Sequence, residues 1–422
     1  MGSRRRTTVH SRGVWLGVVY LAATSGAAGE SPGDGQLARF QERVRQDMTT
    51  IPNYTCLETI ERAHRDPHSR AFKPVDTVRL EVSSVAGKEL FAWPGSHHFE
   101  DRDVTSMVTS GAIGTGMFAM FSHKLFVAGK GTFECLGAEK LAGQASIHCQ
   151  FHLTSQDSGF EITTGTGSEV VAAKGSFWFD PLSLDLMRLD VYGEAMPYSL
   201  RLEEAVFQTN YARTRIGAGA ALLPKRTELT MTHFSGEASR DVIEFSDCRE
   251  YRSESTIRFD TPPASLPESP KATREVDLPA GLLVPVELEA AIVSKTASVG
   301  DPLRGRVVED VRQNGELMLP RGAVITGHIR KLDRNSGAKP FAVGIELSDV
   351  EWAGAHATFY GEMVDLDAKS AGTHRPLTYF DNHAQKVAID ALPGAGVFYI
   401  DGGKFHIPPG FHMVWRTRVI SR

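Results

Sequence analysis

Hydrophobic and polar residues alternate along most of this chain in short runs separated by turn-forming residues. The runs at 77–85, 146–153 and 226–234 are examples, and a period of two is typical of strands with one buried face. Such runs recur from 54 to about 254. The pattern therefore predicts a long antiparallel meander in this part of the chain.

A helical period precedes the meander. Leu37, Phe40, Val44 and Met48 follow one another at steps of three, four and four residues, and Pro52 ends the pattern. We expect a helix over 35–50, capped by Asp34. One amphipathic helix before many strands predicts a mainly β fold, in which a single curved antiparallel sheet forms a half-barrel around the helix.

Residues 104–128 interrupt the alternation with few charges and many glycine, methionine and phenylalanine residues. This segment can be a second helix packed as ordinary core, or a lid over an apolar cavity in the sheet. Methionine and glycine suit a surface that repacks around varied ligands. The candidate ligand-binding residues are those that share one helical face here, namely Met117, Phe118, Phe121, Leu125 and Phe126.

A stretch rich in proline and serine, 255–277, predicts a linker between a first domain, 35–254, and a second, 278–422. The second domain repeats an apolar-Pro-x-Gly turn before strand-like runs. In these turns we expect proline at the first corner and glycine at the last position. The pattern predicts an all-β domain, a small barrel or sandwich. The three turns are at 278–281, 319–322 and 407–410.

The first 29 residues have the order of a secretory signal peptide. Arg4, Arg5, Arg6 and Arg12 precede an apolar stretch at 14–23, and small residues follow. That stretch is too short to span a membrane, so we expect a mature chain without a transmembrane segment, in the periplasm or outside the cell. Cleavage near Gly29 moves the formal charge from −5 to −9, with 42 basic against 51 acidic residues, which disfavours nucleic acid as a partner.

Four cysteines, Cys56, Cys135, Cys149 and Cys248, fit an oxidising compartment and allow three pairings. We favour Cys135–Cys149, which sit symmetrically about a plausible hairpin turn at 140–143, and Cys56–Cys248, which would join the first strand of the domain to its last. Two free buried thiols are the alternative. The spacing argues against a metal site.

The sequence nominates no catalytic residue, metal ligand or cofactor. The Gly-x-Ser-x-Gly string at 29–33 straddles the expected cleavage region and lacks the preceding strand that a nucleophile elbow requires. His148 and His152 would be too far apart on one strand to share a metal, so we interpret them as surface histidines.

The first domain resembles the superfamily of periplasmic lipoprotein carriers and their outer-membrane receptors (LolA/LolB-like). The likeness lies in the leading helix, the meander, and the pieces at 177–181, 186–189 and 222–224. The resemblance implies that acyl chains lie on the concave side of a half-barrel, with 104–128 as the lid.

Residues 278–327 resemble the outer-membrane barrel domain of type IV secretion and conjugation channel (TrbI-like) proteins. The matching pieces are at 278–281, 284–288, 292–294, 307–311 and 317–322, with Gly327. The inner-membrane helix and long proline-rich arm that precede the barrel in that family are not seen here. The resemblance implies a barrel-like fold at the cell envelope.

These observations together predict a non-catalytic, secreted binding protein for a lipid, an acyl chain or another apolar small molecule. An outer-membrane or envelope protein is a possible further partner. Two alternatives stay open: an accessory component of an envelope or secretion assembly, and an envelope hydrolase whose active site is assembled only in space.

Overall fold

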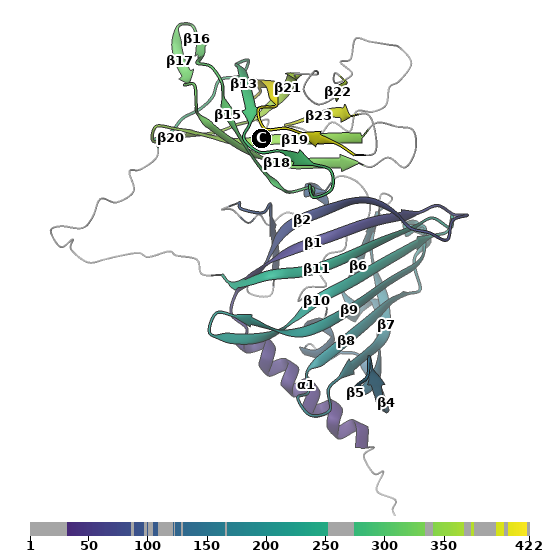
Figure 1. Ribbon diagram of the computed structural model, residues 1–422. Helices are drawn as coiled ribbons and strands as arrows, with labels where there is room; N and C mark the ends of the chain where they lie inside the picture. Colours follow the sequence, from purple (N-terminus) through teal and green to yellow (C-terminus); the bar gives the residue numbers. More distant parts are fainter. Residues whose placement is uncertain are drawn as a thin grey trace, which may run out of the picture.

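The computed structural model shows a mainly β protein built on two large sheets, antiparallel except for the parallel pair β12–β20 in the second, with few helices (Figure 1). It describes residues 32–85, 88–96, 99, 104–108, 121, 123–127, 130–164, 167–251, 274–333, 341–366, 373–374, 394–400 and 404–419. The expected signal peptide lies outside these residues, and so does most of the expected linker.

The first sheet has eleven strands in the order β3-β2-β1-β11-β10-β9-β8-β7-β5-β4, with β6 paired to β7. The two end strands of this order, β3 and β4, do not pair with each other. The curved sheet therefore stays open as a half-barrel and does not close into a barrel. Its strands are β1 Tyr54–Arg65, β2 Lys73–Val85, β3 Lys88–Ala92, β4 Thr132–Leu141, β5 Gln144–Leu153, β6 Phe160–Thr164, β7 Gly167–Phe179, β8 Leu186–Glu194, β9 Leu202–Ile216, β10 Gly219–His233 and β11 Ala238–Glu250.

Directly opposed residues of neighbouring strands share a face, so one row of partners can be followed across the sheet. From β7 to β2 the row is fully buried and mostly apolar, except at its centre. There the hydroxyls of Thr209 and Thr227 hydrogen-bond at 3.0 Å. This row defines the concave face; its members are Cys135, Cys149, Phe177, Leu189, Thr209, Thr227, Ile243, Ile60 and Val78.

Short helices and one long one accompany the first sheet. Helix α1 spans Pro32–Thr50, three residues more than expected, so Asp34 lies inside the first turn instead of capping it. Proline is well suited to that turn because its missing N–H needs no partner there. The other helical elements among the described residues are α2 Val104–Met107, the π-helical turn η1 His123–Val127, α4 Ser155–Ser158 and the 3₁₀ turn η2 Tyr198–Leu200.

Both expected disulfides are present, Cys135–Cys149 and Cys56–Cys248. The first joins opposed residues of the β4–β5 hairpin. Its two-residue turn, Ala142 and Gly143, has positive φ at both positions, as hairpin turns require. The second joins β1 to β11, the first and last long strands of the half-barrel in chain order.

The second sheet contains ten strands, with β12-β20-β19-β18-β15-β13-β25-β21 as its main order. Strands β22 and β23 lie off this path, and β23 pairs with both β19 and β22. Its strands are β12 Arg274–Glu275, β13 Leu283–Leu288, β15 Pro302–Val307, β18 Val324–Asp333, β19 Phe341–Trp352, β20 Ala355–Thr358, β21 Gly361–Leu366, β22 Thr373–His374, β23 Ala395–Ile400 and β25 His412–Thr417. Two small two-stranded sheets accompany it, β14 Ile292–Val293 with β24 His406–Ile407, and β16 Val311–Gln313 with β17 Glu316–Leu319.

Each apolar-Pro-x-Gly turn precedes a strand, β13, β18 or β25. In the second of these turns, the expected geometry is wrong by one position. The N–H of Ala323 donates to the carbonyl of Pro320, so Pro320 is the first residue of the turn and not its first corner, and Gly322 is the third residue and not the last. Its φ of 84° explains why glycine is needed at that position.

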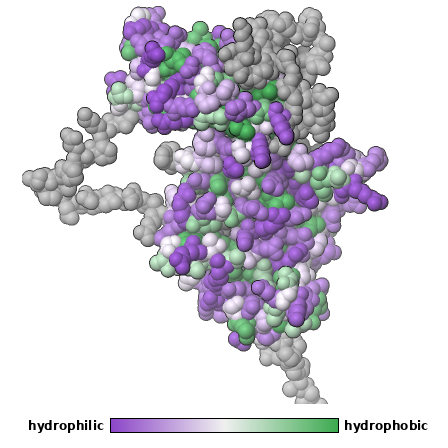
Figure 2. Space-filling view, viewed as in Figure 1, coloured by the Kyte–Doolittle hydropathy of each residue, from purple (hydrophilic) through white to green (hydrophobic). Residues whose placement is uncertain are grey.

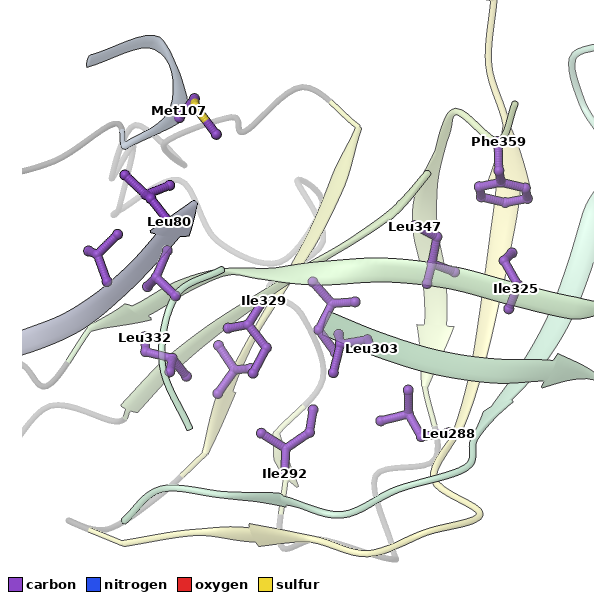
Figure 3. Close-up of a cluster of buried hydrophobic side chains, with 14 of the residues drawn as sticks. Leu80, Met107, Leu288, Ile292, Leu303, Ile325, Ile329, Leu332, Leu347 and Phe359 are labelled. Atoms are coloured by element: carbon purple, nitrogen blue, oxygen red, sulfur yellow. The ribbon is translucent and has the colours of Figure 1, made fainter. Parts of the chain in front are cut away.

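The two sheets are joined by backbone pairing and a shared apolar core. Val299 pairs with the edge of β2: its N–H donates to the carbonyl of Thr77 at 2.8 Å, and its carbonyl accepts from the N–H of Arg79 at 2.7 Å. Figure 3 shows Leu80 and Met107 facing Ile329 and Leu332 across this junction. All four belong to one cluster of buried apolar residues.

Candidate functional site

The concave face of the half-barrel is the candidate site, because it is a broad apolar wall covered by elements that are not part of the sheet. The face turned to the viewer in Figure 2 is mostly hydrophilic over the first sheet. On the opposite face Phe151, Phe177, Val191 and Phe207 are buried. Helix α1 and η1 supply the side chains that cover this wall.

Three of the five candidate ligand-binding residues lie in described positions. Phe121, Leu125 and Phe126 are buried, with exposures of 4%, 0% and 0%. We call these three residues the plug. Met117 and Phe118 lie outside the described residues. The burial of the plug fits both interpretations of the segment, as ordinary core or as a displaceable lid. A role of the plug residues in ligand binding therefore stays a prediction.

The plug enters an aromatic cluster under α1. Phe40 of α1 stacks on Phe177 and Phe179, with ring centroids 5.4 and 4.4 Å apart. Phe126 meets the rings of Phe40 and Phe177 edge-on, at 5.1 Å in each case. Edge-to-face and stacked pairs each add about 1 kcal/mol beyond the burial of their area.

A second aromatic contact places the other end of the plug further along the wall. The ring of Phe121 lies 6.2 Å from that of Phe151 and 5.9 Å from that of Phe160. The plug therefore lies along strands β5 to β7 and fills the space that a ligand on this wall would need.

Among the described residues, few polar contacts connect α1 and η1 to the sheet. Asp47 of α1 forms an ion pair with Arg213 at 2.8 Å, and Arg213 also binds Asp185. These carboxylates raise the pKa of the Arg213 guanidinium. Lys124 of η1 donates to the carbonyl of Gly159 at 3.4 Å. These contacts lie at the margins, and the centre is held by apolar packing.

The other end of the concave face is charged. Arg62 donates to Asp76 through two hydrogen bonds, Nε to Oδ1 at 2.7 Å and Nη2 to Oδ2 at 2.5 Å. Asp241 lies opposite Arg62 and is 1% exposed, and burial raises the pKa of its carboxyl to about 7. Glu58 is 4% exposed, and burial, with the charges of Glu89 and Asp241, raises the pKa of its carboxyl to about 8.

Reasoning from the sequence missed this charged region entirely. Its residues come from β1, β2 and β11, and each is a single charged residue in an otherwise ordinary strand pattern. A weak signal was available: Glu58, Arg62 and Asp241 fall on the expected inward positions of their strands, where polar residues are rare.

The convex face carries an open hollow of about 540 Å³ across β4, β5, β7 and β8, bordered by residues such as His152, Lys174 and Tyr192. Both His152 and Lys174 bind the carboxylate of Glu194 at 2.9 Å. His148 stacks on Trp178 with ring centroids 4.5 Å apart. These two histidines therefore occupy partly exposed positions with separate partners. In the described part of the chain, no cluster of histidine, cysteine and acidic residues could hold a metal ion.

None of the helices in the described ranges combines the length and the apolar character needed to cross a membrane.

Comparison with known proteins gives only distant likenesses. No family model matches the chain, and no curated protein matches it. Among solved structures, a domain described as an outer membrane lipoprotein-sorting protein from Vibrio parahaemolyticus is 14% identical, with 53% of this chain and 95% of that chain covered and a TM-score of 0.28. A DUF1329 family protein from Desulfovibrio piger is 11% identical, with coverages of 52% and 94% and a TM-score of 0.29. A LolA superfamily protein from Nitrosomonas europaea is 14% identical, with coverages of 51% and 94% and a TM-score of 0.27. Likenesses at these scores carry no assignment of ligand or function.

Proposed function

We propose that this chain is a non-catalytic binding protein of the cell envelope that holds an apolar chain, such as a lipid acyl chain, on the concave face of its half-barrel. The observation that carries the proposal is the plug. An apolar wall is closed by Phe121, Leu125 and Phe126, and these side chains belong to a short segment outside the sheet. A ligand would bind by taking their place.

The free energy gained by burying the plug is similar to the free energy gained by burying an alkyl chain in its place. Burying three large apolar side chains contributes about 5 to 9 kcal/mol, at about 1.5 to 3 kcal/mol each. A twelve-carbon chain that takes their place buries methylene groups worth about 0.8 kcal/mol each, or about 10 kcal/mol in all. An acyl chain can therefore compete with the plug without unfolding the sheet.

A fluorescent probe with an uncharged head, N-dodecyl dansylamide, tests the proposal on the full chain. We expect the probe to bind, and Phe121→Ala to tighten binding by at least tenfold. The shortened side chain destabilises the closed plug by a few kcal/mol and is not needed once the ligand is bound. Leu182→Ala is the matched control, since Leu182 is 91% exposed on the β7–β8 turn and should leave affinity unchanged.

The same variants separate the two readings of the 104–128 segment. Phe121→Ala lowers the melting temperature under either reading, but if the segment is only core, the probe fails to bind either protein. Native mass spectrometry of protein purified without detergent supplies an independent readout, because a bound lipid appears as added mass. Probe binding that is equally strong in wild type and Phe121→Ala would contradict displacement of the plug.

A further inference from the structure

A second row of opposed residues runs across the concave face and changes character along its length. Where the plug residue Phe121 packs, the row is apolar; at β11, β1 and β2 it becomes charged. Its members are Phe133, Phe151, Gly175, Val191, Phe207, Leu229, Asp241, Arg62 and Asp76.

The row brings a carboxyl group within reach of a ligand on the apolar wall. Asp241 lies two strands from Phe207, because Leu229 is the partner of both. Neighbouring strands are about 4.8 Å apart, so Asp241 is about 10 Å from Phe207 across the sheet. An alkyl chain lying over Val191 and Phe207 would therefore bring its polar end to Asp241.

One oxygen of the buried Asp241 carboxyl lacks a hydrogen-bond partner among the described residues. Asp241 is 1% exposed, and its Oδ2 atom is buried without a hydrogen bond in the described part of the structure. Leaving such an atom unpaired costs about 1 to 3 kcal/mol, and more when the group is charged. Besides burial, which raises the pKa of the Asp241 carboxyl, the positive charge of Arg62 lowers this pKa and the negative charge of Asp76 raises it. Arg62 is already bound to Asp76, so one guanidinium does not neutralise both carboxylates.

The balance of charges defines the group that would complete this site. Arg62 and Asp76 form a neutral pair, so an ionised Asp241 leaves an excess of negative charge, and a protonated Asp241 leaves an acceptor oxygen without a donor. Glu58, also buried on this face, adds a second carboxyl group nearby. A hydrogen-bond donor, cationic or neutral, satisfies the site, whereas an anionic head is repelled.

We propose that Asp241 seats the hydrogen-bond-donating head, an amine or a hydroxyl, of an amphiphile whose alkyl chain replaces the plug. This inference rests on the proposed function and narrows its ligand class. The alkyl chain of the ligand would lie over the apolar part of the row, and its head group would lie at the charged part.

Three probes with the same twelve-carbon chain test the head preference: dodecylamine, dodecan-1-ol and dodecanoate, each used below its aggregation concentration to displace N-dodecyl dansylamide from the full chain. We expect the amine and the alcohol to bind at least tenfold more tightly than the carboxylate. In Asp241→Asn the advantage of the amine should fall to less than threefold. The matched control is Glu244→Gln, which removes an exposed carboxyl group on the other face of the same strand.

The outcomes distinguish the two proposals. If all three compounds bind with equal affinity to the wild-type protein, the head preference is wrong and the apolar site stands. If Asp241→Asn stays folded by circular dichroism and keeps the full preference for the amine, Asp241 is not the seat. If neither the fluorescent probe nor any of the three compounds binds, both proposals are overturned.

Discussion

At the scale of single residues, Glu58 links pH to stability. Burial raises the pKa of its carboxyl from 4.5 to about 8, and the charges of Glu89 and Asp241 act in the same direction. The folded protein therefore holds this proton more tightly than the unfolded chain does. The stabilisation that results is fully present below pH 4.5 and is lost as the pH rises to about 8, where the folded protein must bury a carboxylate.

Replacing Glu58 with glutamine should remove this dependence. We expect Glu58→Gln to match the wild type near pH 4 and to exceed it by roughly 5 kcal/mol at pH 9 in the free energy of unfolding, measured with urea. Glu61→Gln is the control, because Glu61 is an exposed carboxylate on the same strand. A wild-type stability that does not fall between pH 5 and pH 9 relative to Glu58→Gln would show that Glu58 is ionised at little cost.

At the scale of elements, the two disulfides connect strands that already pair, but they close loops of very different length. Cys135 and Cys149 are 14 residues apart, and Cys56 and Cys248 are 192 apart. Loop-closure entropy in the unfolded chain predicts about 3 kcal/mol for the short loop and about 5 kcal/mol for the long one. Replacing each pair by alanine should reproduce this order in guanidinium denaturation. Equal losses would contradict an entropic origin.

The elements also show what the sequence could predict. The β4–β5 hairpin and its disulfide were predictable, because the turn and both cysteines lie within a few residues of one another. Strand β6 was missed, since its alternation covers only five residues, Phe160–Thr164, and glycines follow. The charged end of the concave face could not be predicted. Arg62 and Asp241 lie opposite each other only because β1 pairs with β11, and these are the first and the last strand of the half-barrel along the sequence.

At the scale of the whole molecule, the half-barrel and the second sheet contact each other along the edge of β2. Arg79 forms an ion pair with Asp301 at 2.8 Å, and the guanidinium of Arg330 lies 5.0 Å from the centre of the Trp93 ring. Gly300 lies between these contacts with a φ of 94°. A side chain there would collide with the carbonyl of Arg79 and with Trp93.

Gly300→Ala should therefore separate the two sheets without unfolding either. Its Cβ atom has no space, because the obstacle is backbone that is itself hydrogen-bonded to Val299. We expect a larger radius of gyration by small-angle X-ray scattering, and stronger binding of a hydrophobic dye as the shared apolar cluster around Leu80 and Ile329 becomes exposed. Gly315→Ala is the matched control. Gly315 also has a positive φ, 85°, but a methyl group there would meet no atom within 4 Å, so the change adds backbone strain of about 1 kcal/mol and no collision. If the two variants behave alike, strain rather than close packing explains the glycine, and the junction is looser than the backbone pairing implies.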